Sequence, residues 1–245
     1  MISPAVILGG TAMKAFVGFF LTIAFVGPAW ADPQDDMSLA DKKGFDSYLS
    51  SPAYAGRLSD MLKNAKTASF SGCENVTTDA PRIVVIKPIK VGPESTPIAG
   101  VWKVTVPAQG CGKSRLINAF FVVGKENKVF FLLTIPGTSR GDPQLQKDTL
   151  FYVFMASARK NADCKAPSII NSRFETDEKP SVIANAPPQF KSLVFDRQSR
   201  ETWSVEACGR FFEVPVHYMH STAGTTITAA ESEVVEVTKD QADKQ

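Results

Sequence analysis

The feature that most constrains this chain is a short pattern that occurs twice: a tryptophan strand that ends at a cysteine, a glycine and a basic residue. The two copies are Trp102 with Cys111-Gly112-Lys113, and Trp203 with Cys208-Gly209-Arg210. One further cysteine precedes each tryptophan, Cys73 in the first case and Cys164 in the second. The four cysteines of the chain are therefore shared equally between two similar stretches. This arrangement predicts two related units that arose by internal duplication.

Residues 1–31 have the three parts of a secretory signal peptide. Lys14 is their one charged residue, an apolar run covers 15–26, and Ala29-Trp30-Ala31 is a small-x-small cleavage site. A membrane anchor is the alternative, but it needs about 20 apolar residues and no cleavage signal after them. We expect translation to begin at Met13 and the signal to be cleaved after Ala31. The mature protein would then be periplasmic or secreted, without stable membrane insertion.

An even number of cysteines in an exported chain predicts disulfide bonds, because the oxidising compartment keeps paired thiols bonded. Four cysteines allow three pairings, and two related units favour Cys73 with Cys111 and Cys164 with Cys208. Each bond would close a loop of about 40 residues and contribute roughly 3 to 4 kcal/mol in the chain-entropy model. A zinc site is the alternative. It is disfavoured because the chain has no C-x-x-C pair and would have to hold zinc in an oxidising compartment.

The charge balance excludes several classes of partner. The chain has 27 basic and 25 acidic residues, and removal of the signal peptide takes away one lysine and no acid. No run of Lys or Arg is long enough to neutralise a row of phosphates, so nucleic acid and anionic membranes are not expected partners. Calcium-loop, P-loop, dinucleotide-glycine and H-E-x-x-H motifs are also missing from the sequence. We expect a monomer without cofactor or metal, whose partner is an unknown ligand or an envelope protein.

Hydrophobic periodicity predicts an α+β fold in which each unit packs a helix on a mainly antiparallel sheet with one disulfide. The first unit spans 53–141. Its expected elements are a helix at 53–66 with an apolar stripe (Leu58, Met61, Leu62, Ala65), strands at 68–72, 82–91 and 98–106, and a hairpin at 116–123 and 129–135. Residues 32–52 before this unit are polar and charged at their start, and we expect them to be loose.

The second unit spans 142–237 and begins with a helix that extends to about residue 160. Asp142 is its expected cap and Pro143 its first helical residue. Its expected apolar stripe (Leu150, Phe151, Phe154, Ala158) would cover the apolar hairpin of the first unit. Strands follow at 168–174, 190–196, 201–207, 211–220, 225–229 and, at an edge, 232–237. The last residues, 238–245, are too polar to order on their own.

The repeated tryptophans and Cys-Gly corners have a structural interpretation. A large indole beside a disulfide fills the centre of a small sheet domain, and glycine after cysteine supplies a position without a Cβ penalty. Stacking of Trp102 and Trp203 on a ligand is the functional alternative.

Three groups of residues could carry chemistry. The first is Gly137-Thr138-Ser139-Arg140-Gly141, which satisfies the G-x-S-x-G pattern of serine hydrolases and is followed in the chain by Asp196 and by His217 or His220. An elbow serine leads directly into its helix, whereas here the helix cap comes three residues later, and the chain reads as hairpins rather than a parallel sheet. We therefore expect Ser139 to lie in a turn.

The second group is His217-Tyr218-Met219-His220, which holds both histidines of the chain. Strand alternation places His217 and Met219 on one face and His220 on the other with Val214, Val216 and Tyr218. Histidine and methionine together suit copper, but two ligands do not complete a site. The third group is the loop 176–189 with Asp177 and Glu178, where paired carboxyl groups alone are weak evidence for acid-base chemistry.

Three segments resemble uncharacterised exported proteins of Gram-negative bacteria: 136–148, 201–210 and Val214-Pro215-Val216. The resemblance implies an exported location and a similar fold over most of the mature chain, and it assigns no catalytic residue.

The sequence favours an exported, disulfide-stabilised protein that binds a ligand or associates with the envelope without catalysis. The alternatives are a small secreted serine hydrolase that uses Ser139 and a periplasmic copper-binding protein that uses His217 and Met219.

Overall fold

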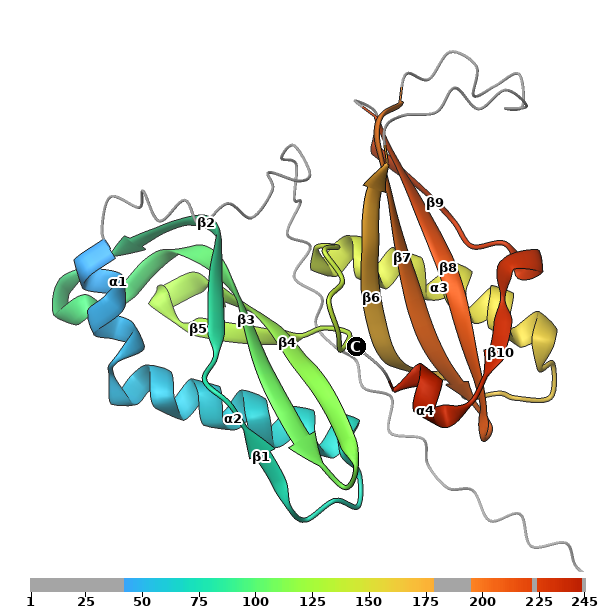
Figure 1. The fold of residues 1–245 in the computed structure, drawn as a ribbon. Helices are drawn as coiled ribbons and strands as arrows, with labels where there is room; N and C mark the ends of the chain where they lie inside the picture. The colour runs from blue at the N-terminus through green and yellow to red at the C-terminus, as the bar shows by residue number, and fades with distance from the viewer. Residues whose placement is uncertain (1–41, 179–194, 222–223, 244–245) are drawn as a thin grey trace, which may run out of the picture. The chain divides into compact units, whose positions relative to one another are not determined.

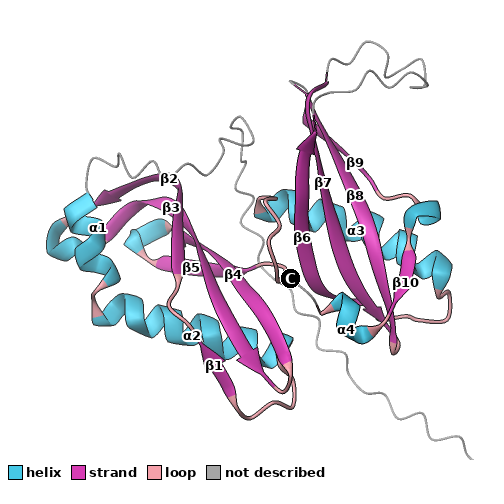
Figure 2. Ribbon diagram, in the orientation of Figure 1, coloured by secondary structure: helices cyan, strands magenta, loops and turns pink. Residues whose placement is uncertain are grey.

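The structure, a computed structural model, describes residues 42–178, 195–221 and 224–243. These residues belong to one compact unit, Pro33–Gln245. They form two similar halves, each with a five-stranded antiparallel sheet, a long helix and one disulfide (Figures 1 and 2). The α+β fold class is confirmed, as are the bonds Cys73–Cys111 and Cys164–Cys208. The predicted signal peptide lies outside the described residues.

The first half contains two helices and five strands. They are α1 (Lys42–Leu49), α2 (Pro52–Ser69), β1 (Val76–Thr78), β2 (Arg82–Val91), β3 (Pro97–Gly110), β4 (Lys113–Val123) and β5 (Val129–Leu133). The strand order is β1-β3-β4-β5, with β2 also paired to β3. The predicted strand at 82–91 and the predicted hairpin are confirmed, and Pro88 lies where the β2–β3 register shifts.

Helix α2 covers the tryptophan face of the first sheet (Figure 1). Ser51 caps the helix by accepting a hydrogen bond from the Tyr54 backbone N–H at 3.2 Å. The predicted stripe is confirmed, because Met61 and Ala65 are buried in the core and Leu58 and Leu62 pack against it. The strand predicted at 68–72 is wrong, since α2 continues to Ser69. A short apolar run next to a helix does not distinguish helix from strand.

Helix α1 corrects the expectation that all of 32–52 is loose. Its Phe45 and Tyr48 are buried against Trp102, with ring centroids 5.3 and 6.0 Å from the indole. Aromatic burial of this kind stabilises a segment whose polar sequence suggests disorder. Trp102 therefore packs in an aromatic cluster with α1 and Phe121, in the core cluster against which Cys73 also packs.

In the described residues, the second half also has a long helix followed by five strands, but it has no counterpart of α1 and ends in a short helix. It consists of α3 (Pro143–Lys160), β6 (Ser168–Glu178), β7 (Phe195–Ala207), β8 (Arg210–Ser221), β9 (Gly224–Thr228), β10 (Val235–Val237) and α4 (Lys239–Ala242). The sheet order is β10-β8-β7-β6, with β9 also paired to β8. The sequence predicts separate strands at 190–196 and 201–207, but in the described residues a single strand, β7, runs from Phe195 to Ala207. Residues 190–194 lie outside the described residues.

The two halves agree in local detail. Helices α2 and α3 each have 18 residues and begin with proline after a side-chain cap. The first cysteine of each half donates its backbone N–H to the C-cap residue, Cys73 to Phe70 and Cys164 to Asn161. The second cysteine has a positive φ in both halves, 49° for Cys111 and 53° for Cys208. Such a φ is uncommon outside glycine, so both corners make the same unusual turn.

Helix α3 begins as predicted but packs elsewhere than predicted. Asp142 caps it by accepting from the Leu145 N–H at 2.9 Å. Its Val153 and Ala156 join Trp203 in the core of the second half, so α3 covers β7 and β8 rather than the hairpin of the first half. The inner face of that hairpin is covered by α2. Phe151, expected in the buried stripe, is 66% exposed.

The C-terminal residues also differ from the expectation of disorder. Thr238 and Gln241 form a reciprocal capping box at the start of α4, and Ala242 is fully buried. Short polar helices of this kind escape prediction because their stability comes from capping and docking rather than from an apolar stripe.

Candidate functional site

The G-x-S-x-G motif lies in the linker 134–142 that connects β5 to α3. Ser139 is buried, with 1% of its surface exposed. Its hydroxyl donates to Glu201 Oε1 at 3.2 Å and accepts from the Gly141 backbone N–H at 3.2 Å. The Arg140 backbone N–H donates to the same Glu201 oxygen at 2.8 Å. The carboxyl group of Glu201, on β7, therefore binds two consecutive residues of the linker.

Glu201 is itself buried and uses both of its oxygens. Its Oε2 accepts a hydrogen bond from the Trp203 indole N–H at 2.9 Å and lies 3.5 Å from the Tyr218 hydroxyl. Burial raises the pKa of Tyr218, and the nearby charge of Glu201 raises it further. Thr149 on α3 adds a hydroxyl 3.3 Å from the Tyr218 hydroxyl. A buried carboxyl group is tolerated only when donors satisfy it in this way.

Lys103 and Asn118 hold the linker from strands β3 and β4. The Lys103 ammonium donates to the Ser139 carbonyl oxygen at 3.0 Å. Burial lowers the pKa of Lys103, while attraction to Glu201 opposes this shift. The Asn118 side-chain amide donates to the Ile135 and Gly137 carbonyl oxygens at 3.0 and 2.7 Å. The linker backbone is thus hydrogen-bonded by buried or half-buried side chains along most of its length.

This geometry differs from that of a nucleophilic serine. An activated serine needs an accessible hydroxyl, a base within hydrogen-bond reach and donors for the oxyanion. The Ser139 hydroxyl is covered and already bonded to Glu201. His217 Nε2 lies 2.8 Å from Glu233, and His220 bonds to Ser199 and Thr225, so neither histidine is hydrogen-bonded to Ser139. The side chain of Asp196 lies outside the described residues.

The second predicted group is arranged as strand alternation predicted. His217 and Met219 lie on the less buried face of β8, while Tyr218 and His220 lie on the buried face. Among residues 42–178, 195–221 and 224–243, no group of three or more His, Cys, Asp or Glu side chains is placed to hold a metal ion.

The third predicted group is described only in part. Asp177 forms an ion pair with Arg140 at 3.1 Å, and both side chains are 40% exposed. The Arg140 guanidinium also stacks over the Phe174 ring, 3.7 Å from its centroid. An exposed ion pair contributes little to stability. The two contacts of Arg140 therefore serve mainly to hold the linker beside β6. The side chain of Glu178 and the loop from 179 onward lie outside the described residues.

The two tryptophans are fully buried but differ in their polar surroundings. Trp203 donates to Glu201, two residues before it. The corresponding position before Trp102 is Gly100, where a Cβ would lie 2.5 Å from Ile89. The Trp102 indole N–H is buried without a hydrogen-bond partner in the described part of the chain. Glu201 is therefore a feature of the second half alone, and neither indole presents a face on which a ligand could stack.

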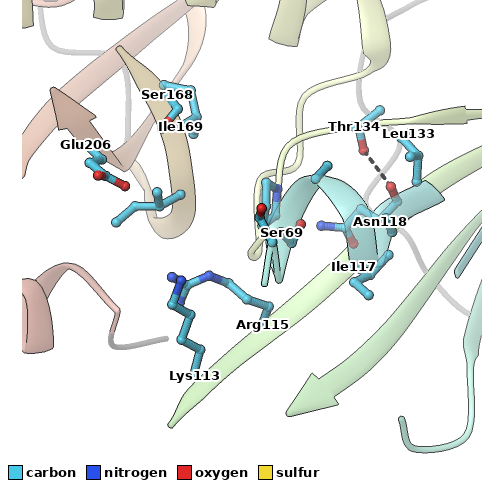
Figure 3. A pocket seen from close by; sticks show the side chains of 15 residues that line it. Ser69, Lys113, Arg115, Ile117, Asn118, Leu133, Thr134, Ser168, Ile169 and Glu206 are labelled. Atoms are coloured by element: carbon cyan, nitrogen blue, oxygen red, sulfur yellow. Dashed lines mark hydrogen bonds between the residues drawn. The ribbon is translucent and has the colours of Figure 1, made fainter. Parts of the chain in front are cut away.

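A polar hollow of about 280 Å³ is a further candidate site (Figure 3). Its lining includes Ser69, Ser168 and Glu206, and the side chains of Lys113 and Arg115 point toward the same space. Arg115 is buried and paired with Asp243, so its charge is already neutralised. Ligand pockets are usually larger and mostly apolar, which makes this hollow the weaker candidate. In the sequence, this hollow is indicated only by Arg115, a charged residue at the start of the apolar strand β4.

Fold and site together define a disulfide-stabilised α+β protein whose most distinctive polar cluster anchors a linker. No family model, curated protein or solved structure matches the chain. Within the described residues, no helix has the length and apolar character needed to span a membrane.

Proposed function

We propose that this protein is exported, loses its signal peptide near Ala31, and acts in the periplasm or outside the cell by binding a partner rather than by catalysis. The two disulfides support this location, because such bonds persist in oxidising compartments. The similar halves support an origin by internal duplication, which accounts for the long helix, the cysteine positions and the consecutive antiparallel strands, β2 to β5 and β6 to β9, in both.

The observation that carries the binding role is an apolar cluster on the outer face of α3. Phe151, Tyr152 and Met155 are all exposed, and the two aromatic rings meet edge to face at 5.6 Å. The opposite face of α3, with Val153 and Ala156, is already committed to the core. Exposed apolar clusters rimmed by polar residues mark interaction sites in soluble proteins. Aromatic and methionine side chains are enriched in such interfaces, so the partner is expected to be an apolar segment of another envelope protein.

A photoreactive amino acid at position 151 tests this role in the native compartment. We expect a specific adduct with one envelope protein, and loss of that complex in Phe151→Ser with an unchanged thermal midpoint. The matched control is the same photoreactive residue at Lys63, an exposed position on α2. Equal adducts from both positions, or none from 151, would contradict a partner site on α3.

Catalysis is tested separately with a serine-reactive fluorophosphonate. The buried hydroxyl of Ser139 and its bond to Glu201 predict no labelling of the folded protein and no esterase activity that depends on Ser139. Stoichiometric labelling that disappears in Ser139→Ala would instead establish the hydrolase alternative.

A further inference from the structure

Within the described residues, strand β5 is a sheet edge without the features that usually protect one. Its sequence, Val129–Leu133, is Val-Phe-Phe-Leu-Leu, with no charge and no proline. Its register with β4 is continuous, from Val123 opposite Val129 to Ala119 opposite Leu133, without a bulge. Exposed edges normally carry lysine, proline, a bulge or a covering segment, because unpaired backbone groups can pair with another chain.

Three other edge strands in the described residues, β2, β6 and β10, have such protection. Strand β2 carries Lys87, Pro88 and Lys90, and its register against β3 shifts three times. The edge of β6 is covered by the linker, because the Thr138 N–H donates to the Ser172 carbonyl oxygen at 2.7 Å. The Thr138 hydroxyl in turn accepts from the Phe174 N–H at 2.8 Å. Strand β10 has three residues, one of them Glu236. Strand β9 is also an uncharged edge, but its sequence is Gly-Thr-Thr-Ile-Thr, whereas every residue of β5 is apolar.

Two backbone hydrogen bonds fix which groups of β5 point outward. The Gly124 N–H donates to the Lys128 carbonyl oxygen, and the Thr134 N–H donates to the Asn118 carbonyl oxygen. Hydrogen-bonded pairs alternate along an antiparallel ladder, so Phe130 and Leu132 also bond to β4. The backbone N–H and C=O groups of the alternate residues, Val129, Phe131 and Leu133, therefore point away from β4 toward the free edge.

The side chains of β5 add an apolar strip beside these groups. Phe130 is 54% exposed and Leu132 is 51% exposed, both on the outer face of the sheet. The other face is packed, with Phe131 6.1 Å from the Phe121 ring and Val129 buried. Any strand that pairs with this edge would satisfy the backbone groups and cover the exposed side chains at the same time.

We propose that β5 pairs with β5 of a second copy of this chain, antiparallel and centred on Phe131. In this register Phe131 lies opposite the partner's Phe131, and Val129 lies opposite the partner's Leu133. All the outward backbone groups meet, which gives about six hydrogen bonds in an antiparallel ladder. The exposed Phe130 of each copy then lies beside the partner's Leu132, on the same face of the joined sheet.

Self-pairing suits this strand better than pairing with an unrelated segment. With a two-fold axis through Phe131, each residue of β5 lies opposite an apolar residue of the partner strand. A shift of the register by one residue would place the outward backbone groups of one strand opposite groups that already bond to β4 in the other. Lys128 at one end lies opposite the partner's Thr134, so no like charges oppose each other. The interface is small beside stable dimers, which bury about 1,200 Å² or more. We therefore expect a weak dimer, with a Kd of about 10 to 100 µM, and the monomer expected from sequence at lower concentration.

The first test is sedimentation of the oxidised protein from about 1 to 300 µM, a range that brackets the expected Kd. The unsubstituted protein should pass from monomer to dimer. The double variant Phe130→Lys, Leu132→Lys should remain monomeric with an unchanged circular dichroism spectrum, because both side chains are exposed. The corresponding double glutamate variant should also be monomeric, and mixing the two variants should restore dimers. The matched control, Phe151→Lys on α3, should dimerise normally.

The second test is amide hydrogen exchange at low and high protein concentration. The amides of Val129, Phe131 and Leu133 should exchange about three to seven times more slowly at about 300 µM than at about 1 µM, because about 10 to 35% of the chain is still monomeric at the higher concentration with this Kd. Those of Phe130 and Leu132 should not change. A protein that stays monomeric at about 300 µM, roughly three times the upper end of the expected Kd range, would overturn the proposal. So would a dimer that survives the double lysine substitution, a dimer lost in Phe151→Lys, or protection independent of concentration.

Discussion

At the scale of single residues, Glu201 explains the position of the G-x-S-x-G motif, because its carboxyl group binds Ser139 and Arg140. It is a buried carboxyl group whose two oxygens bind the Ser139 hydroxyl, the Arg140 N–H and the Trp203 indole. The G-x-S-x-G pattern was visible in the sequence, but the partner of Ser139 lies 62 residues later, on strand β7. Only the fold brings the two together. The same fold leaves Trp102 without such a partner, because Gly100 occupies the corresponding position.

Removal of Glu201 should therefore destabilise the protein strongly. Glu201→Ala removes the acceptor of four donors, those of Ser139, Arg140, Trp203 and Tyr218. We expect the free energy of unfolding to fall by about 3 to 5 kcal/mol. Ser139→Ala removes one donor to Glu201 and the acceptor of the Gly141 N–H, and should cost about 1 to 3 kcal/mol. Urea unfolding at pH 7 measures both, with Asp60→Ala on the exposed face of α2 as the control. Equal small effects from Glu201→Ala and Asp60→Ala would show that the cluster does not anchor the linker.

Tyr54 predicts how stability responds to alkaline pH. Burial raises its pKa from 10.0 to about 12, and its hydroxyl is buried without a hydrogen-bond partner in the described residues. Below pH 10 the hydroxyl is protonated in both the folded and the unfolded state. As pH rises from about 10 to about 12, the unfolded state releases the proton first, so stability is lost.

Tyr54→Phe should reduce this alkaline loss and leave stability at pH 7 nearly unchanged, because no hydrogen bond is removed. Urea unfolding at pH 7, 9, 10 and 11 provides the comparison. An identical pH dependence in the variant and the parent would mean that Tyr54 keeps its ordinary pKa in the folded state.

At the scale of secondary-structure elements, local signals predicted where helices begin but not what they cover. The Asp142 cap followed by proline predicted the start of α3, and the structure shows the same arrangement, Ser51 followed by Pro52, at the start of α2, which was predicted from residue 53. The buried face of α3 was misassigned because apolar residues occur on several sides of this helix, so their periodicity does not identify a single buried face. Phe151 was expected inside and is outside, while the small residues Ala156 and Ser157 are buried.

The assignment of faces on α3 predicts a clear contrast between neighbouring substitutions. Val153 is fully buried, so Val153→Ala should lower the free energy of unfolding by about 1 to 3 kcal/mol through lost contacts and a cavity. Phe151→Ala removes a larger side chain from an exposed site and should change stability by less than about 0.5 kcal/mol. Thermal unfolding of the two variants decides the matter. A larger loss of stability for Phe151→Ala would show that Phe151, and not Val153, packs against the sheet.

At the scale of the whole molecule, the cysteine pattern predicted most of the architecture. Four cysteines with two tryptophans implied two similar halves and the pairing within each. The ends of the folded region were not predictable in the same way. Helix α1 depends on contacts of Phe45 and Tyr48 with Trp102, which lies more than 50 residues later in the chain, and α4 depends on its capping box and on burial of Ala242. Such contacts leave no local period in the sequence.

The central claim is that this is an exported, fully oxidised protein. The intact mass of the protein recovered from the cell envelope or the medium, before and after reduction and alkylation, tests it most directly. We predict a chain that begins at Asp32, takes up no alkylating reagent before reduction, and takes up four equivalents afterwards, one for each cysteine of the sequence. A chain that retains residues 13–31, or one whose cysteines react without reduction, would contradict the account.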